Sequence, residues 1–430
     1  MSKILSLDLG SSSCRLLLTE KTITNFEILF YAEKTYAEPL RDTFNEENRI
    51  IITNQLKNLV RDFKNIDKEI DYCNVGFGGS SNNSVIIQSS MQTDKDDEII
   101  TQEQISLLTK NNPKINSFTT HNTTHIIPLE YSLDGMEGIR HPLGMHSKKI
   151  GVHNLYVNVE KNQIDLVKSM IMESGLQPKY MISEIIASSS FLLNADEKEI
   201  GSLIIDIGAA STDFCLTKKG NPVYTGSIPV GGNQFTSDLS IAFSTNLDFA
   251  NQLKLETSCT PENERIAEKI IIKDKDSTKT TEITKRQISQ VLKERVVEIF
   301  TMIKQEIVEN LGQQNLPERI ILTGGASKAD GIIAQARYIF QAKTRLADTK
   351  NIKFLGENLS LEALTSLSMA NYMHNIDFNA EFTKQMDNES TGIKGNIDIP
   401  NITQFGSNIQ TSVKMNIIEL FKKIKSIGKR

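Results

Sequence analysis

The stretch GSLIIDIGAASTDFCLTKKG, at residues 201–220, decides the fold, because it places an acid and a small-residue turn between two apolar runs. The apolar run before Asp206 is nearly continuous, which is typical of a strand buried on both faces. Gly208 and the small and hydroxyl residues after it predict a tight turn into a second strand, with backbone N–H groups pointing outward. Taken alone, the stretch is also compatible with an ordinary β-hairpin.

The same order of residues opens the chain, in KILSLDLGSSSCRLLL at 3–18. The two units, at 3–19 and 202–217, lie about half the chain apart and indicate a duplicated core, which makes two unrelated hairpins a poor explanation. Amphipathic helices are predicted within 163–180, with a stop at Gly175 and Pro178, and over about 284–311. Strands that alternate with helices predict the α/β class.

Length and composition limit the function. A chain of 430 residues with 39% hydrophobic residues is expected to form a soluble globular protein of two or more domains. Its net charge of −5 argues against nucleic acid as a partner. The four cysteines lack metal-ligand spacing and are interpreted as reduced thiols in a cytosolic protein. Neither a signal peptide nor a membrane-spanning segment is predicted.

Three further segments differ from the duplicated core. Residues 84–162 contain their own strands and a helix opened by Thr101 and Gln104, and are predicted to be an inserted subdomain. Residues 375–412 are polar and lack periodicity, as in a linker. The end of the chain, 413–430, combines an apolar stripe with basic flanks and predicts an amphipathic helix on an anionic membrane surface; packing on a protein surface is the alternative.

The two hairpins could together hold phosphates. Asp8 with Gly10–Ser13, and Asp206 with Gly208–Thr212, are expected to face each other across a cleft. Backbone N–H groups would bind the phosphates, and both acids would hold Mg²⁺ through water. The alternative is that each acid caps a turn. Gly324–Gly325, after an apolar strand, would lie flat against adenosine or form a simple loop.

Several longer motifs resemble those of one family. They are HIIPLEYSLDG with HPLGM, SEIIASSSFLLNADEKEIGSLIIDIG, GSIPVGGNQFTSDLS, ITKRQISQVLKERVVEIF and ILTGGASKADGI. Together with the phosphate hairpins, they resemble the superfamily of actin, sugar kinases and DnaK-type chaperones, and in detail the FtsA family of bacterial cell-division proteins. The resemblance covers the chain to about residue 345.

The resemblance implies an actin-like, ribonuclease-H-like duplicated two-domain ATPase fold with an inserted α+β subdomain and a C-terminal amphipathic helix. The implied parts are subdomain 1A at 1–83, 163–198 and 361–374, subdomain 1C at 84–162, subdomain 2A at 199–229 and 306–360, subdomain 2B at 230–305, the linker at 375–412 and the helix at 413–430.

The resemblance also implies the residues of an ATP and Mg²⁺ site. Glu184 would order water near the terminal phosphate, with Asp206 as the second catalytic residue; Glu184 could instead be a helix cap or a surface acid. Lys254, with Asn251, would reach the ribose or base, unless Lys254 is a solvated helix lysine. The implied cofactor-binding residues are Asp8, Gly10, Ser11, Ser12, Ser13, Asp206, Gly208, Ser211, Thr212, Gly231, Gly232, Asn233, Asn251, Lys254, Gly324, Gly325 and Ala326.

Departures from the family pattern predict ATP binding with weak or absent turnover. Ala209–Ala210 stand where the family usually has glycines, and their methyl groups crowd the approach to the γ-phosphate. Asn251 replaces the usual Glu, and Ile185 the usual Pro.

The implied function is to tether FtsZ filaments to the cytoplasmic face of the inner membrane at the division septum, with self-polymerisation. The implied partners are the FtsZ C-terminal peptide, anionic inner-membrane lipids, further copies of the chain and other division proteins bound through 84–162. Arg286 and Arg295 could bind the FtsZ peptide, or could pair with Glu294 or Glu298. The alternatives are a soluble actin-superfamily phosphotransferase or ATPase, and a pilus-assembly actin-like protein.

Overall fold

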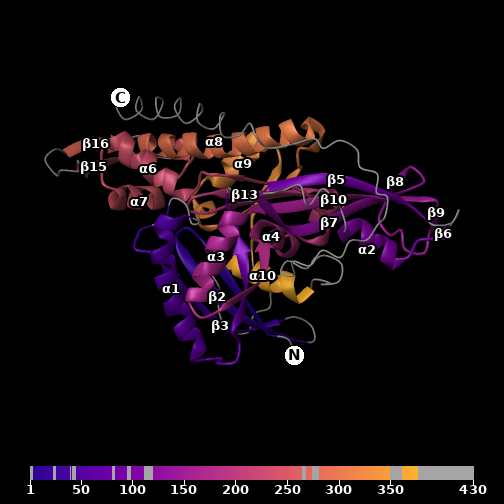
Figure 1. The fold of residues 1–430 in the computed structure, drawn as a ribbon. Helices are drawn as coiled ribbons and strands as arrows, with labels where there is room; N and C mark the ends of the chain where they lie inside the picture. Colours follow the sequence, from indigo (N-terminus) through magenta and orange to yellow (C-terminus); the bar gives the residue numbers. More distant parts are fainter. Residues whose placement is uncertain are drawn as a thin grey trace.

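Two five-stranded sheets form the centre of the molecule (Figure 1). The predicted linker, apart from Asn375, and the predicted C-terminal helix lie outside the described residues. The computed structural model describes residues 3–22, 26–38, 40, 45–79, 83–93, 98–110, 120–263, 268–273, 280–348 and 361–375.

The first sheet has the order β11-β4-β1-β2-β3. Strands β1, β2 and β3 are antiparallel, whereas β4 runs parallel to β1 and β11 parallel to β4. Its strands are β1 (Lys3–Leu9), β2 (Ser13–Lys21), β3 (Phe26–Thr35), β4 (Tyr72–Phe77) and β11 (Gln177–Ser183).

The second sheet repeats this arrangement, with the order β14-β13-β12-β17-β18. Again three antiparallel strands are followed by two parallel ones. Its strands are β12 (Ser202–Ile207), β13 (Thr212–Lys218), β14 (Asn221–Ile228), β17 (Arg319–Thr323) and β18 (Lys343–Leu346). The duplicated core predicted from the two hairpin sequences is therefore confirmed.

Helices cover both sheets and separate them. Helices α1 (Glu46–Lys64) and α3 (Lys161–Glu173) pack on the first sheet, and α8 (Lys285–Leu311) and α9 (Ile332–Phe340) on the second. Between the sheets lie α4 (Glu184–Leu192) and α10 (Leu364–Asn375), whose Ile185 and Leu367 join one core with residues of both sheets. Helix α5 (Ala195–Ile200) leads into β12.

Two sequence signals decide the ends of these helices. Thr284 caps α8 through a capping box with Gln287, as helix-start chemistry predicts. The helix predicted within 163–180 ends at Glu173, because Gly175 adopts a φ of +95° and the chain then enters β11.

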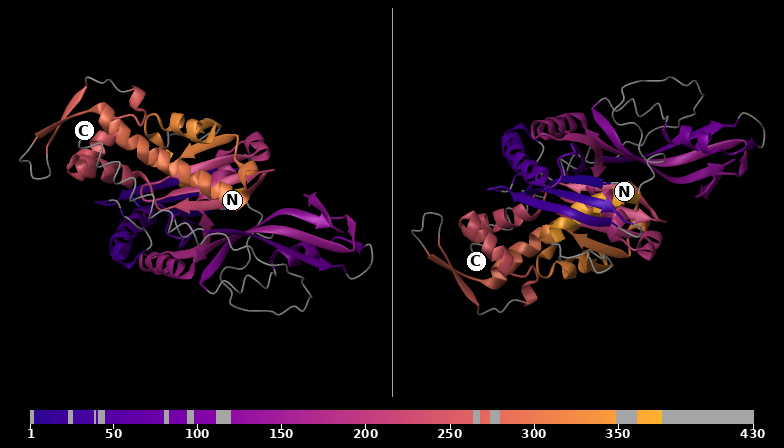
Figure 2. Two further views of the ribbon diagram at one scale, coloured as in Figure 1. Left: turned by 90° about the horizontal axis from the view of Figure 1, so that it is seen from above. Right: turned by 90° about the horizontal axis from the view of Figure 1, so that it is seen from below.

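The inserted segment forms a separate sheet with the order β5-β10-β7-β8. Figures 1 and 2 show it projecting to one side of the two central sheets. His125 lies at its base, where its Nε2 accepts a 2.8 Å hydrogen bond from the Ser183 N–H, and burial lowers its pKa to about 3. The elements are β5 (Asn83–Gln92), β6 (Glu98–Ile99), α2 (Gln102–Lys110), β7 (His121–Leu133), β8 (Met136–Ile139), β9 (His146–Ser147) and β10 (Lys149–Glu160).

At the far end of the second sheet, α6 and α7 pack together beside the start of α8. This region contains α6 (Gly232–Phe243), α7 (Leu247–Glu256), β15 (Lys269–Lys273) and β16 (Thr280–Thr284). No helix among the described residues is long and apolar enough to cross a membrane.

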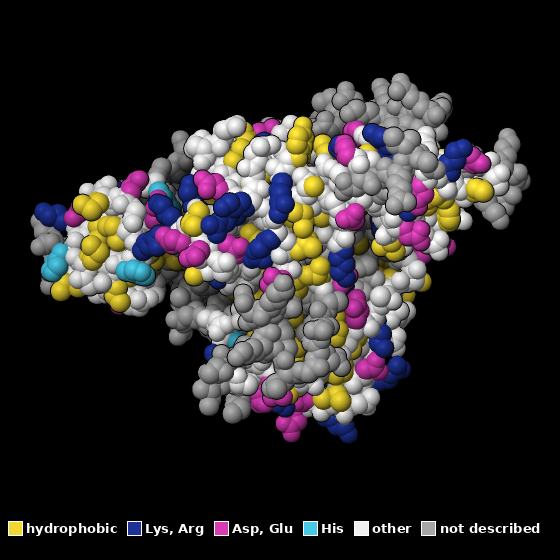
Figure 3. Space-filling model, turned by 180° about the vertical axis from the view of Figure 1, so that it is seen from behind, with side chains coloured by type: hydrophobic (Ala, Val, Ile, Leu, Met, Phe, Trp, Pro, Cys, Tyr) yellow, Lys and Arg dark blue, Asp and Glu magenta, His cyan; other side chains and the backbone are white. Residues whose placement is uncertain are grey.

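Acidic and basic side chains are interspersed over the face of the molecule seen in Figure 3, without a broad field of one sign. All four cysteines are free and buried, and burial raises the pKa of each thiol to about 12. The prediction of unpaired thiols agrees with this arrangement.

Candidate functional site

The tips of the two predicted phosphate hairpins meet. Asp8 stands near the end of β1, and Asp206 near the end of β12. The Ala210 N–H in the second tip donates a 3.0 Å hydrogen bond to the Ser11 hydroxyl in the first. Residues 199 positions apart are thereby brought together, as the sequence predicts for two facing hairpins.

The hydroxyl groups at the tips have different surroundings. Ser13 donates a 2.7 Å hydrogen bond to Glu33, and Thr212 donates a 2.7 Å bond to the Val230 carbonyl. Both hydroxyls are buried, so their bonds stabilise the hairpins internally. The carbonyl of Ser12 likewise accepts a 3.0 Å bond from the Tyr36 N–H.

The start of α6 supports the second tip. The Gly232 N–H donates to the Gly208 carbonyl at 2.9 Å, and the Asn233 N–H to the Ala209 carbonyl at 2.8 Å. A Cβ at Gly231 would lie 2.7 Å from the Gly208 oxygen, so a side chain there would displace the tip. Residues 231–233 therefore fix the shape of the second tip through their own backbone.

The Gly324–Ala326 turn closes against the same region. Gly324 has a φ of +86°, and a Cβ there would meet Asp206 Oδ1 and would lie 2.6 Å from the Ile207 carbonyl oxygen. A Cβ at Gly232 would lie 3.1 Å from the Ala326 Cβ. Gly325, in contrast, is exposed. The third predicted element thus contacts both the acid and the helix start.

Lys254 on α7 bends back onto α6. Its Nζ donates a 2.9 Å hydrogen bond to Thr236 Oγ1 and approaches the Gly232 carbonyl at 3.5 Å. The side chain is half-buried and its ammonium group is bonded to Thr236, which differs from the solvated helix lysine of the alternative interpretation; burial also lowers its pKa. Asn251 accepts a 3.5 Å bond from the same threonine hydroxyl, and its side chain is exposed.

Glu184 is neither a helix-capping side chain nor a surface acid. It is the first residue of α4, and its carboxylate packs against the strand end at Gly76 and Gly78, where a Cβ at Gly78 would lie 2.7 Å from Glu184 Oε2. Burial, followed by the charges of Asp8, Asp213 and Asp206, raises its pKa well above the ordinary value.

Asp206 and Asp213 extend this acidic group. They are directly opposite each other in the β12–β13 pair. Burial, together with the charges of Asp213 and Asp8, raises the pKa of Asp206 to about 7. Burial also raises the pKa of Asp213. An added positive charge would relieve this mutual repulsion.

Arg15 is a buried cation that the sequence analysis missed. Its Nη1 donates to Asp8 Oδ2 at 3.1 Å, and its Nη2 pairs with Glu33 at 3.0 Å. Ser366 of α10 also donates to Asp8, at 3.4 Å. Arg15 and Asp8 are register partners in the β1–β2 hairpin, as Asp213 and Asp206 are in the β12–β13 hairpin. Pairing the predicted strands would have identified both missed residues.

The donor set fits a nucleotide with a hydrated Mg²⁺. Among the described residues, no three or more His, Cys, Asp and Glu side chains are arranged as direct ligands of a metal. Mg²⁺ keeps several of its waters and takes only one or two carboxylates, so it needs no such cluster. Asp8 and Asp206 are the acids at the two glycine-containing tips and would hold these waters.

The duplicated sheets and the facing tips define the class: the fold is actin-like. The PilM–PilN type IV pilus biogenesis complex has a TM-score of 0.56 and 15% identity, covering 85% of this chain and 97% of that chain. MreB5 of Spiroplasma citri bound to ADP has a TM-score of 0.54 and 15% identity, covering 88% of this chain and 98% of that chain.

Two family models identify the family within this class. The model described as "Cell division protein FtsA" matches residues 203–372, and the model described as "SHS2 domain inserted in FTSA" matches residues 80–158. The chain belongs to the FtsA family of cell division proteins. The resemblance proposed from the sequence motifs is confirmed.

Curated relatives agree with this assignment. Cell division protein FtsA of Pseudomonas aeruginosa is 29% identical over 232 residues, which are 54% of this chain and 56% of the relative. That of Escherichia coli is 27% identical over 270 residues, 60% of this chain and 63% of the relative. The matched regions thus span between half and two thirds of these relatives.

Proposed function

We propose that this protein binds ATP with Mg²⁺ between its two sheets and tethers FtsZ filaments to the cytoplasmic face of the inner membrane at the septum. The observation that carries the proposal is the meeting of two glycine-containing hairpin tips beside Asp8, Glu184, Asp206 and Asp213 in a member of the FtsA family. Mg²⁺ bound with ATP would supply positive charge between the carboxylates and the phosphates.

The site is better suited to holding ATP than to hydrolysing it. Burial and the charges of Asp8, Asp213 and Asp206 raise the pKa of Glu184, so the site without its cation disfavours the ionised carboxylate that would accept a proton from water. The Ala209–Ala210 pair also brings side chains to a tip that usually consists of glycines. We therefore propose weak or absent turnover.

Bound ATP would act by fixing the angle between the two sheets. A ligand that contacts both tips favours the arrangement in which both can reach it. This arrangement would set the geometry for self-association into filaments. The subdomains implied by the sequence, 1A, 1C, 2A and 2B, would be the units that move.

Arg295 does not support the proposed contact with the FtsZ peptide. Arg295 is 2% exposed, and its guanidinium pairs with Asp238 at 2.6 Å and with Glu298 at 2.5 Å. The alternative, in which Arg295 pairs with Glu298 three positions along the same helix, is therefore correct. Arg286, exposed on α8, remains the proposed partner.

Nucleotide binding and membrane tethering are tested separately. A fluorescent ATP analogue titrated with Mg²⁺ is expected to bind the full chain and to be displaced by ATP; the absence of binding contradicts the proposed site.

For the membrane, the full chain and a version ending at Gln410 are sedimented with anionic and with neutral vesicles, with and without FtsZ. Only the full chain should pellet, only with anionic lipid, and it should carry FtsZ with it. If both versions stay in solution, the soluble phosphotransferase or pilus-assembly alternative is favoured, and a screen for phosphoryl transfer follows.

A further inference from the structure

The inserted subdomain contacts the second sheet although the chain enters and leaves it from the first. It follows β4 and precedes α3 and β11, so its covalent connections are with the first sheet. Its strands β5, β7 and β10 nevertheless lie against β14, the edge strand of the second sheet. The insert therefore contacts both sheets, through β7 on β11 and through β5, β7 and β10 on β14, and projects to one side of them (Figure 2).

The central contact joins Ser84 on β5 to Thr225 on β14. The Ser84 hydroxyl donates a 2.9 Å hydrogen bond to the Thr225 carbonyl and accepts a 3.0 Å bond from the Thr225 N–H. Both residues are buried. Because Ser84 and Thr225 are both buried, loss of the hydroxyl takes the partner from a buried donor and a buried acceptor.

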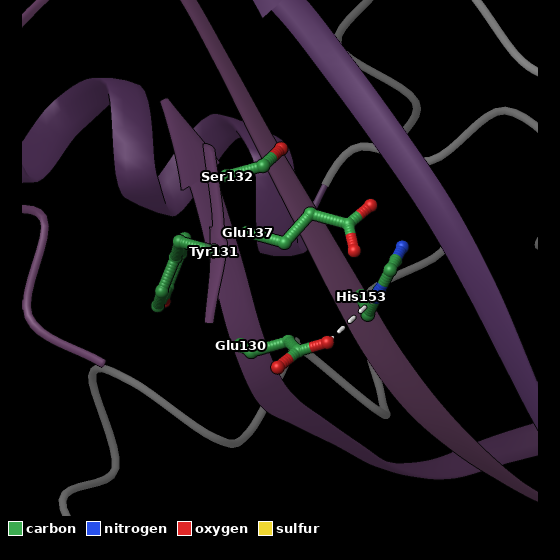
Figure 4. Close-up of a pocket in the computed structure, with 5 residues that line it drawn as sticks. All are labelled: Glu130, Tyr131, Ser132, Glu137 and His153. Atoms are coloured by element: carbon green, nitrogen blue, oxygen red, sulfur yellow. Dashed lines mark hydrogen bonds and ion pairs between the residues drawn. The ribbon is translucent and has the colours of Figure 1, made fainter. Parts of the chain in front are cut away.

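Two ion pairs also join the insert to the second half of the chain. Arg140 pairs with Glu199 at 2.6 Å, and Glu130 with Lys219 at 3.9 Å. Glu130 also lies 3.4 Å from His153 Nδ1, in the hollow shown in Figure 4. These side chains are partly exposed, so each pair contributes little to the free energy of the contact. The buried Ser84–Thr225 contact is the stronger candidate for holding the two parts together.

A second contact joins Gly79, which follows β4 just before the insert, to the acidic site. The Gly79 N–H donates to both carboxylate oxygens of Asp213, at 2.9 Å each. Gly79 has a φ of +84°, which a residue with a side chain rarely adopts. Asp213 faces Ser227 across the β13–β14 pair, on the same strand as Thr225. The contact of the insert and the contact of the segment that leads into it therefore end on one strand pair of the second sheet.

We propose that the Gly79–Asp213 and Ser84–Thr225 contacts form one latch, through which occupation of the carboxylate site sets how firmly the inserted subdomain is held against the second sheet. The inference rests on the proposed function, since ATP and Mg²⁺ are the expected occupants. An occupant that draws the Asp213 carboxylate away from Gly79 removes a contact that exists only while the insert is held against the second sheet. Coupling requires such a difference between the held and the released state.

The latch is tested by a double-mutant cycle in the full chain without nucleotide. Hydrogen exchange of the backbone amides in 83–92 and 221–228 is measured for Ser84→Ala, Asp213→Ala and the double variant. A latch predicts that either substitution alone raises the exchange rate. It also predicts that the rate increase in the double variant is smaller, by about threefold or more, than the product of the two single increases.

Ser89→Ala is the matched control, because its hydroxyl lies on the same strand but bonds to the Leu108 carbonyl inside the insert. In the double variant Ser89→Ala, Asp213→Ala, the increase in exchange rate should equal the product of the two single increases. If Asp213→Ala does not fold, Asp213→Asn, which keeps the side-chain volume, replaces it. If the double variant Ser84→Ala, Asp213→Ala also shows the full product of its two single increases, as the control does, the latch is refuted.

A second arm adds Mg²⁺ and ATP, with affinity measured separately. If ATP binds and exchange in 83–92 changes in the wild type but not in Ser84→Ala, the latch is supported. If ATP binds and exchange in 83–92 stays the same, the latch is refuted. If ATP fails to bind while the cycle still shows coupling, the proposed function is wrong and the link between Asp213 and the insert stands.

Discussion

The Ala210 N–H donates a hydrogen bond to the Ser11 hydroxyl oxygen across 3.0 Å, which ties the tip of the second hairpin to that of the first. Ser11 also accepts a 2.7 Å bond at its carbonyl from the Leu40 N–H, and Leu40 accepts one from the Asn233 side chain at 3.4 Å. Hydrogen bonds between polar groups of the two halves thus align them at the site. A ligand bound there would replace these hydrogen bonds with its own.

Mg²⁺-dependent ATP binding should strengthen as pH rises through about 7. Asp206, with a pKa of about 7, is mostly protonated at pH 6 and mostly ionised at pH 8. Since a metal site requires the ionised carboxylate, one proton released near this pKa changes affinity about tenfold between pH 6 and 8. Titration of a fluorescent ATP analogue at each pH measures this change. In Asp206→Asn, binding should be weak and the pH dependence lost; an unchanged pH profile in this variant contradicts the assignment.

Gly324→Ala should unfold at lower temperature and bind nucleotide weakly. The alanine Cβ would need a φ near +86° and would press on Asp206 and on the Ile207 carbonyl. Backbone strain of this kind costs about 1–3 kcal/mol. Gly325→Ala is the matched control, because the nearest atoms to its Cβ, on Glu362, are 3.7 Å away. Thermal unfolding that is equal for the two variants would argue against the close packing of this turn.

Glu306→Gln should stabilise the protein above pH 7. Burial raises the pKa of Glu306 to about 7, although the Tyr224 hydroxyl donates to it at 2.9 Å. The folded state therefore holds this proton more tightly than the unfolded state, whose pKa is about 4.5. Below pH 4.5 the protonated Glu306 makes its full contribution to the free energy of unfolding. This contribution, at most about 3 kcal/mol, is lost as pH rises through 7.

Glutamine keeps an acceptor for the Tyr224 hydroxyl and cannot ionise. The melting temperature of Glu306→Gln relative to wild type should therefore increase between pH 5 and 8. Glu256→Gln, at the exposed end of α7, serves as the control. A difference that stays constant over this range would mean that Glu306 does not titrate there.

Arg295→Ala should be strongly destabilising. Removing the guanidinium leaves Asp238 and Glu298 as neighbouring buried acids without their cation. Breaking a buried ion pair by removing one partner costs about 3–5 kcal/mol. Denaturant unfolding measures the loss. Arg286→Ala is expected to unfold at nearly the same denaturant concentration as the wild type and to bind the FtsZ peptide more weakly. An Arg295→Ala protein as stable as the wild type would contradict the buried network.

Local sequence patterns predicted the parts of this fold that depend on neighbouring residues. The apolar runs ending at Asp8 and Asp206 identified both hairpins, because a buried strand followed by a glycine turn has a clear signature. Their strand register would also have placed Arg15 beside Asp8, since opposite residues in a hairpin share a face. The pairing of Arg15 with Asp8 could therefore be predicted from the sequence.

Contacts between distant segments had no such signature. Nothing local to Ser84 or Thr225 distinguishes these hydroxyl residues from others on strands, although they join the insert to the second sheet. Arg295 likewise looked like one of several exposed helix charges, because its burial depends on Asp238 from α6. Which polar groups become buried was decided by packing that single-sequence patterns do not encode.

The burial of all four native cysteines makes the wild-type chain a ready background for site-specific chemistry. A thiol whose pKa is near 12 reacts slowly with maleimide at neutral pH, both because it is not a thiolate and because the reagent cannot reach it. One cysteine introduced on the insert and another on β14 could therefore carry a pair of fluorophores without removing any native residue.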